Sequence, residues 1–164
     1  MNQKGAAEKG ATRLGESFVL AVSLERDVFR RGDPIAVSLR FDNVGRTVIE
    51  MDGILPLREH AAPPCLEVDG DDGRQIRVEH GVSRDLMTTE PLVVQPGRSV
   101  LLMYVDLLDA PGWVRSLKER QNGEPGRSFD RLASCLIPGD YSIRGNFQPT
   151  AGRYPSTTEW VPFT

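Results

Sequence analysis

Several features that would assign this 164-residue chain to a specialised class are missing from its sequence. No run of about 18 apolar residues is present, and this excludes a transmembrane helix. Basic and acidic residues nearly balance, with 20 Lys and Arg against 23 Asp and Glu. This balance fits neither a disordered polyelectrolyte nor a basic protein that binds nucleic acids. No repeat with a period of about 20 to 50 residues is present, so solenoids and propellers are not expected.

Motifs of catalysis and metal binding are missing as well. The chain has no GxSxG nucleophile elbow, no HExxH zinc motif and no GxxxxGK(S/T) phosphate loop. Its two histidines, His60 and His80, lie in separate expected loops, and each follows a glutamate. The acidic turn at 69–72 departs from a calcium-binding loop because Gly73 occupies the third ligand position. We therefore expect no enzyme activity, no metal and no cofactor.

Cysteine is scarce, and Cys65 and Cys135 are the only two. They lie too far apart for a CxxC redox or zinc motif. A disulfide closing the loop between them would add about 4 kcal/mol of stability by the loop-entropy relation. As reduced thiols they would serve as small buried apolar side chains. Their spacing leaves both states open, and we favour free thiols.

The first 16 residues contain a single leucine and cannot form the apolar centre of a signal peptide. We expect a flexible leader over 1–16, followed by one domain over 17–164. If Met1 is the natural start, the protein is expected in the cytoplasm. If an export signal was removed before Met1, the protein is expected to be exported.

Alternating apolar residues predict short β-strands along most of the domain. The clearest run is 35–41, and 18–24 shows the same two-residue period. In the first of these we expect Ile35, Val37, Leu39 and Phe41 to face the core. Runs at 66–69 and 76–78 flank a Gly-Asp-Asp-Gly turn, which is the pattern of a hairpin. Further strands are expected at 47–51, 92–94, 99–107, 141–147 and 160–163.

Some of these segments carry a more specific expectation. Segment 47–51 is expected to pair with the strand before it, through a turn at 43–46. Segment 99–107 is apolar on both faces, which is typical of a central strand. Segment 160–163 is expected at a sheet edge because Pro162 has no N–H to donate, and Trp160 is expected in the core. Three prolines in 55–64 indicate a connection between sheets.

Between residues 111 and 138 the apolar residues fall three and four positions apart. This spacing predicts an inserted segment with short helical turns. A connection of this length commonly binds a partner, and this one combines a tryptophan with several arginines, which are frequent in interface hot spots. The candidate binding residues are Trp113, Arg115, Lys118, Arg120, Arg127 and Arg131.

We hypothesise that this insertion contacts an acidic protein or a carbohydrate. Arg30-Arg31 forms another basic spot of the same kind. The alternative for these basic residues is a solvated face. The insertion also contains the apolar residues Trp113, Leu117, Phe129 and Leu132. The alternative for these residues is that they cap one open end of the fold, since amphipathic spacing predicts burial as well.

About eight or nine short strands without long helices predict an all-β fold, an antiparallel immunoglobulin-like β-sandwich with a short helical insertion. The runs GDPIAVSLRFDN (32–43), VDGDDG (68–73), PGRS (96–99) and PGDYSI (138–143) carry a resemblance. They resemble bacterial immunoglobulin-like domains, including the intracellular proteinase inhibitors of the BsuPI type. The Asp140-Tyr141 turn also resembles a tyrosine corner, with Ile143 in place of the usual cysteine.

From these observations we expect a non-catalytic binding or accessory module. It would recognise a protein or carbohydrate partner through loops at one end and through the 111–138 insertion. The resemblance to BsuPI-type inhibitors implies an alternative, a regulator that lays an exposed loop into a protease cleft. A hydrolase ranks third. Neither a nucleic acid partner nor a membrane span is expected.

Overall fold

The alternating segments of the chain pair into antiparallel sheets. The structure is a computed structural model, and it describes residues 11–13, 18–53, 63–116, 127–129, 131–132, 136–148 and 156–164. One sheet has the order β1-β2-β3-β8, and each neighbouring pair is antiparallel. Its strands are β1 (Ala11–Arg13), β2 (Phe18–Leu24), β3 (Ala36–Asn43) and β8 (Ser99–Asp106).

A second sheet contains seven strands in the order β10-β9-β6-β5-β11-β12, and β13 also pairs with β11. Its strands are β5 (Cys65–Gly70), β6 (Arg74–Val78), β9 (Gly112–Ser116), β10 (Arg127–Phe129), β11 (Tyr141–Phe147), β12 (Ser156–Thr157) and β13 (Val161–Phe163). A separate pair joins β4 (Ile49–Met51) to β7 (Leu92–Val94). The described residues include the short 3-10 helix η1 (Arg84–Leu86), and no helix in them is long and apolar enough to cross a membrane.

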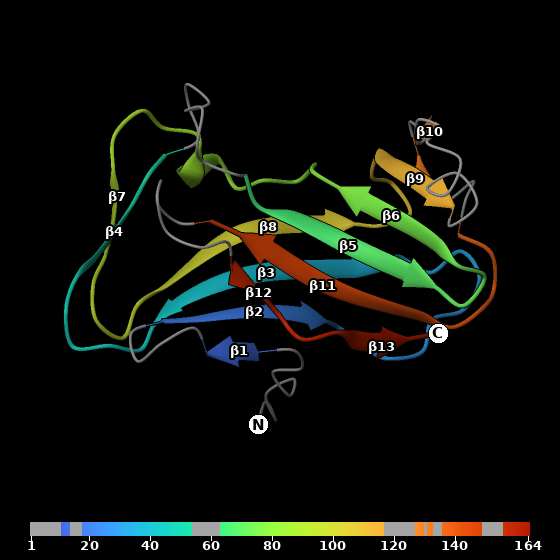
Figure 1. Cartoon of the computed structure of the whole chain (residues 1–164), viewed down its shortest axis with the longest axis horizontal. Coiled ribbons are helices and arrows are strands. Elements are labelled where there is room, and N and C mark those ends of the chain that lie inside the picture. Colours follow the sequence, from blue (N-terminus) through green and yellow to red (C-terminus); the bar gives the residue numbers. More distant parts are fainter. Residues whose placement is uncertain are drawn as a thin grey trace.

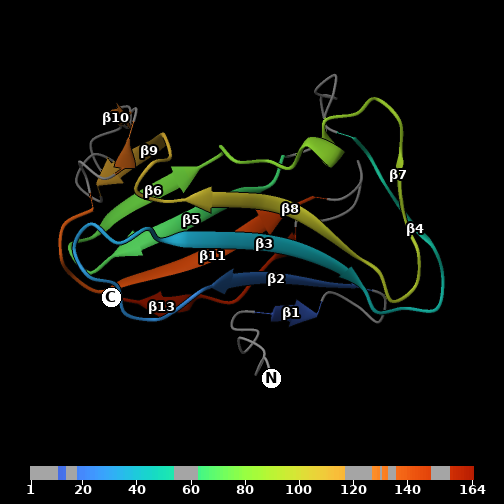
Figure 2. The same cartoon turned by 180° about the vertical axis from the view of Figure 1, so that it is seen from behind.

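The hydrophobic core lies between the two sheets. Figures 1 and 2 view the molecule from opposite sides and show β5, β6 and β11 on one side and β2, β3 and β8 on the other. Phe41 of β3 stacks on Phe18 with ring centroids 4.9 Å apart, and it meets Phe147 of β11 edge-on at 6.3 Å. Gly145 lets β11 approach β3, because a Cβ atom there would lie 2.2 Å from Leu39 Cδ1. The two sheets are therefore in direct contact, for example through the rings of Phe41 and Phe147.

The strands predicted from alternation are confirmed. Ile35, Val37, Leu39 and Phe41 are all buried, whereas the residues between them are partly exposed. β5 and β6 form the expected hairpin, and its turn places Gly73 at a φ of 78° that favours glycine. The all-β antiparallel class is thus confirmed. The described residues form thirteen strands instead of eight or nine, because several strands of two or three residues join the longer ones.

Segment 47–51 contains a strand, but its partner differs from the expected one. β4 pairs with β7 in the register Ile49↔Val94. The buried side chain of Asn43, at the end of β3, explains this arrangement. Its Nδ2 donates to Thr47 O at 2.8 Å and to Val94 O at 2.9 Å, so one amide ties both segments to the end of the sheet.

β8 lies at a sheet edge and not in the centre. Within the described residues it pairs along its length with β3, and its other side meets residues 81–83. Ser83 N donates to Leu102 O at 2.8 Å, and Tyr104 N donates to Gly81 O at 2.9 Å. Leu101 and Tyr104 point away from the core and are 44% and 58% exposed. Some of the apolar residues that predicted a central strand therefore lie on an exposed outer face of β8.

The expectation of helical turns is wrong for 112–116 and 127–129, which form strands, while 117–126, 130 and 133–135 of the insertion lie outside the described residues. β9 and β10 pair antiparallel, with Trp113 opposite Ser128, and β9 extends the sheet alongside β6. Without β9, the backbone N–H and C=O groups along that side of β6 would lack partners. This pairing between distant segments outweighs the local three- and four-residue spacing.

Outcomes are mixed for the remaining segments. Pro162 lies opposite Ser142 on β13, which pairs only with β11 among the described residues, so the edge position is confirmed. Phe147 is buried, but Trp160 is 38% exposed and is not a core residue. Residues 11–13 of the expected leader form β1. Most of that leader and of the 55–64 connection lies outside the described residues.

Candidate binding pocket at one end of the sheets

A pocket of about 550 Å³ opens at the end of the molecule where β11 begins and β13 ends. Three loop regions far apart in the sequence converge there: the turn at 29–33, the residue Leu108 after β8, and residues 136–139 before β11. Ile35, which precedes β3, and the strand residues Tyr141 and Phe163 complete most of its wall. The pocket is therefore built mainly from apolar side chains held at the margin of the core.

Three aromatic rings form one side of this pocket. Phe163 stacks on Tyr141 at 5.4 Å between ring centroids and meets Phe29 edge-on at 6.1 Å. Backbone hydrogen bonds fix the loop that carries Phe29. Phe29 N donates to Thr164 O, and Thr164 N donates to Asp27 O, both at 2.8 Å. The loop at 27–29 thus pairs with the residue after β13, and the rings are positioned without a ligand.

Tyr141 also holds the loop at 136–139 that lines the pocket. Its hydroxyl donates to Ile137 O at 2.6 Å. Burial raises the pKa of the Tyr141 phenol, so the hydroxyl stays protonated and remains a donor near neutral pH. Next to it, Thr164 Oγ1 donates to Asp140 Oδ1 at 2.9 Å. These two bonds connect the loop before β11 to both neighbouring strands.

Two exposed arginines lie at the rim of the pocket. Arg30 and Arg31 are exposed, and neither guanidinium group makes an ion pair within the described residues. The nearest acidic residue in the sequence, Asp33, is already engaged: its Oδ2 lies 3.1 Å from Arg26 Nη1 and accepts the Arg30 N–H at 3.2 Å. Gly32 adopts a φ of 88°, which permits this tight turn. The turn is thus closed by Asp33, and its two arginine side chains remain exposed.

The residues predicted in the insertion are only partly brought together. Trp113 and Arg115 lie on β9, opposite Arg77 and Gln75 of β6. Arg127 begins β10, opposite Val114, and is exposed. The hairpin therefore places these three positions on adjacent strands. Lys118 and Arg120 lie outside the described residues.

The end of the insertion, rather than its beginning, reaches the pocket. Arg131 is exposed, and its Nε lies 3.6 Å from Asp109 Oδ1. Leu132 is fully buried, and its N–H donates to Ala110 O at 2.8 Å, which favours the cap interpretation for this residue. The following described residues, 136–139, then line the pocket. The sequence identifies Arg30-Arg31 as a basic pair. No pattern in the sequence indicates that Leu108 and residues 136–139 lie next to this pair.

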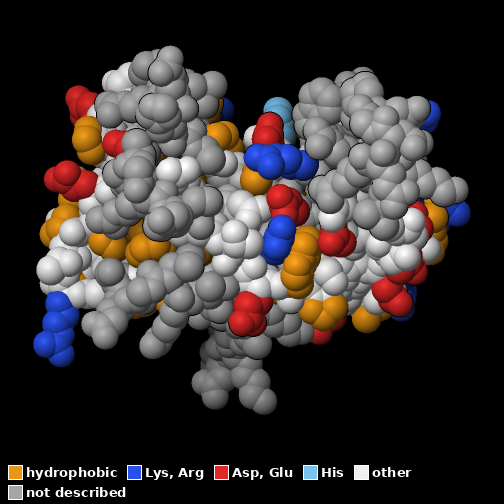
Figure 3. All heavy atoms as spheres, viewed as in Figure 1, with side chains coloured by type: hydrophobic (Ala, Val, Ile, Leu, Met, Phe, Trp, Pro, Cys, Tyr) orange, Lys and Arg blue, Asp and Glu red, His pale blue; other side chains and the backbone are white. Residues whose placement is uncertain are grey.

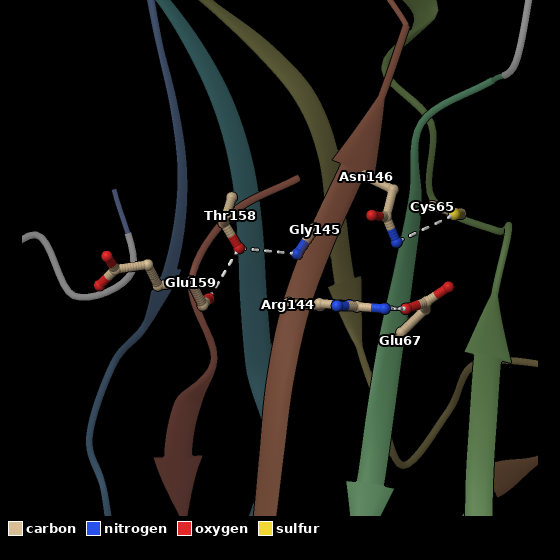
Figure 4. A network of polar contacts seen from close by, with 7 residues as sticks. All are labelled: Cys65, Glu67, Arg144, Gly145, Asn146, Thr158 and Glu159. Carbon is tan, nitrogen blue, oxygen red and sulfur yellow. Dashed lines mark hydrogen bonds and ion pairs between the residues drawn. The ribbon is translucent and has the colours of Figure 1, made fainter. Parts of the chain in front are cut away.

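A polar network on the outer face of the seven-stranded sheet was also missed. Figure 3 shows basic and acidic side chains alternating across the middle of this face. Arg144 Nη2 lies 2.6 Å from Glu67 Oε2, and the Arg144 guanidinium sits 4.5 Å from the ring centre of Trp160. Thr158 Oγ1 accepts the Gly145 N–H at 3.0 Å and donates to Glu159 O at 2.9 Å (Figure 4). These groups satisfy one another, so the network stabilises the loop that carries Trp160.

Cys65 is a buried free thiol at the other end of this network. Asn146 Nδ2 lies 4.0 Å from its Sγ (Figure 4), and burial raises the pKa of the thiol. Cys135 and His60 lie outside the described residues, and His80 is exposed. No group of three or more His, Cys, Asp or Glu residues suited to a metal ion occurs in the part of the chain that the structure describes.

The chain matches no protein-family model, no curated protein and no solved structure.

Proposed function

We propose that this protein is a non-catalytic binding module that holds a protein partner in the end pocket. The observation that carries the proposal is a preformed pocket of about 550 Å³ with an aromatic wall and two exposed arginines at its rim. This volume falls within the roughly 300 to 1,000 Å³ typical of ligand pockets. Loops positioned by a rigid sheet scaffold are also the usual place for recognition.

The chemistry of the lining supports binding over catalysis. Nucleophilic and acid–base mechanisms need a nucleophile or base that can reach a substrate. Among the described lining residues, Asp33 is paired with Arg26 and the Tyr141 hydroxyl is bonded to Ile137 O. The predominantly apolar wall also favours a protein partner over a carbohydrate, whose hydroxyl groups need many hydrogen-bonding partners.

An immunoglobulin-like form of the fold is part of this proposal. Its support is the pair of facing antiparallel sheets and the hydrogen bond from the Tyr141 hydroxyl to a carbonyl four residues upstream. That bond has the geometry of a tyrosine corner. Ile143 occupies the position two residues later, and it packs in the core where immunoglobulin domains commonly carry a cysteine.

A protease regulator is the second candidate. One observation favours it: the turn at 30–33 projects two exposed arginines and is braced at its base by the Arg26–Asp33 ion pair. Trypsin-like proteases accept basic side chains in an acidic pocket. Incubation with a panel of serine proteases tests this candidate, and stoichiometric inhibition that is lost on Arg31→Ala would establish it.

The binding proposal is tested with a random peptide library and a glycan array, each screened against three proteins. These are the wild type, the pocket-filling variant Ile137→Trp, and the control Leu101→Trp, whose side chain lies on the outer face of β8. Ile137 is itself exposed, so the larger side chain is expected to be tolerated. We expect peptides that bind the wild type and the control but not Ile137→Trp. Ligands that bind all three proteins equally, or no ligand at all, would refute the pocket as the binding site.

A further inference from the structure

The pocket has a chemical preference that narrows the class of partner. Ile35, Leu108, Leu136 and Pro138 line it together with the aromatic wall. The side chains of Asp33, Tyr141 and Thr164, which share the lining, already make polar contacts within the protein. A hydroxyl or amide placed there would lose hydrogen bonds to water without gaining equivalent ones. An apolar side chain would instead gain roughly 25 cal/mol for each Å² removed from water. The interior therefore selects a large aliphatic or aromatic group.

The rim has the opposite character, because the charged residues among the described lining are Arg30, Arg31 and an aspartate that is already paired. Three of the acidic residues at this end are engaged: Asp33 with Arg26, Asp109 with Arg131, and Asp140 with the Thr164 hydroxyl. Arg30 and Arg31 are exposed, and neither side chain has such a partner among the described residues. A guanidinium group binds a carboxylate through two parallel hydrogen bonds, which is the strongest pairing open to it at a surface.

Taken together, these features describe a ligand with an apolar group and adjacent carboxylates. We propose that the pocket takes an acidic peptide segment of a protein partner, in which one large apolar side chain enters the pocket while neighbouring Asp or Glu side chains pair with Arg30 and Arg31. This inference rests on the proposed binding function. Charge complementarity at the rim selects an acidic segment over a basic one, because a basic segment would face two exposed cations.

The test begins with the sequences of the peptides selected by the wild-type protein but not by Ile137→Trp. We expect them to share a large apolar residue with Asp or Glu within one or two positions. The dissociation constant of the tightest peptide is then measured for the wild type, for the double variant Arg30→Gln/Arg31→Gln, and for Arg98→Gln. Arg98 is an exposed arginine in the turn before β8 and serves as the matched control. Melting temperatures of all variants establish that the proteins stay folded.

We expect the double variant to bind roughly 5- to 30-fold more weakly, as two exposed ion pairs allow, and Arg98→Gln to bind as the wild type does. Raising the salt concentration should weaken binding to the wild type but not to the double variant. Neutral or basic selected peptides, or equal affinity for the double variant, would overturn this inference while leaving the binding function in place. Failure to select any pocket-dependent ligand would overturn the binding function itself, so the two failures are distinguishable.

Discussion

Phe41 is the side chain whose removal should most directly test the packing between the two sheets. It is fully buried on β3, stacks on Phe18 and meets Phe147 of the other sheet edge-on. Phe41→Ala at such a site costs about 3 to 5 kcal/mol, the sum of lost burial and a residual cavity. Two aromatic contacts, each contributing about 0.5 to 1.5 kcal/mol, place the expected loss in the upper part of that range.

This prediction is measured by urea unfolding followed by circular dichroism. A loss of about 4 to 5 kcal/mol corresponds to a melting temperature lower by roughly 8 to 20 °C for a domain of this size. Leu101→Ala is the control on the neighbouring strand β8: its side chain is partly exposed on the outer face, so it should lose much less. A loss below about 1 kcal/mol for Phe41→Ala, with an unchanged dependence on urea, would refute the ring cluster as a link between the sheets.

Three further predictions concern single residues. Gly145→Ala should destabilise the fold by about 1 to 3 kcal/mol, because its methyl group would meet Leu39; unfolding of the double variant with Leu39→Val should show less than additive loss. Tyr141→Phe should lose about 1 kcal/mol near neutral pH. Because the pKa of Tyr141 is raised in the folded state, the wild type should lose this advantage as the pH rises above about 10, and the two melting curves against pH should converge. In a Cys135→Ser variant, the buried Cys65 thiol should resist a thiol reagent until the protein unfolds, and rapid labelling of the native protein would contradict its burial.

Local patterns predicted most of the longer strands because their physical basis is local. The two-residue period at Ile35 to Phe41 places one face in the core wherever the strand pairs. The partner of each strand is a different matter. β4 joins β7 because the Asn43 amide reaches carbonyl groups on both segments, and nothing in the spacing of 47–51 encodes that contact. Similarly, the strand conformation at 112–116 depends on the open side of β6.

The candidate site also combines a feature that the sequence predicts with one that depends on tertiary contacts. Arg30-Arg31 could be identified in the sequence as a basic pair. The pocket beside it could not, because it requires Phe29, Leu108 and Phe163 to converge from three distant parts of the chain. Trp113 was the reason to predict a binding surface in the insertion, whereas the last residues of the insertion are the ones that line the pocket. Charged residues can be identified in a sequence, but the pocket next to them forms only through tertiary packing.

Residues 81–83 cover part of the edge of β8 that faces away from β3, and this has a consequence for solubility. A strand edge with unpaired backbone groups and exposed apolar side chains is a template for pairing with another chain. Residues 81–83 occupy part of that edge, next to the exposed Leu101 and Tyr104. Gly81 has a φ of 83°, and a Cβ atom there would lie 2.5 Å from Tyr104 O, so a larger residue would displace the cover. Gly81→Val should therefore cause folded molecules to aggregate edge to edge as their concentration rises, and this would be visible by light scattering well below the temperature at which they unfold.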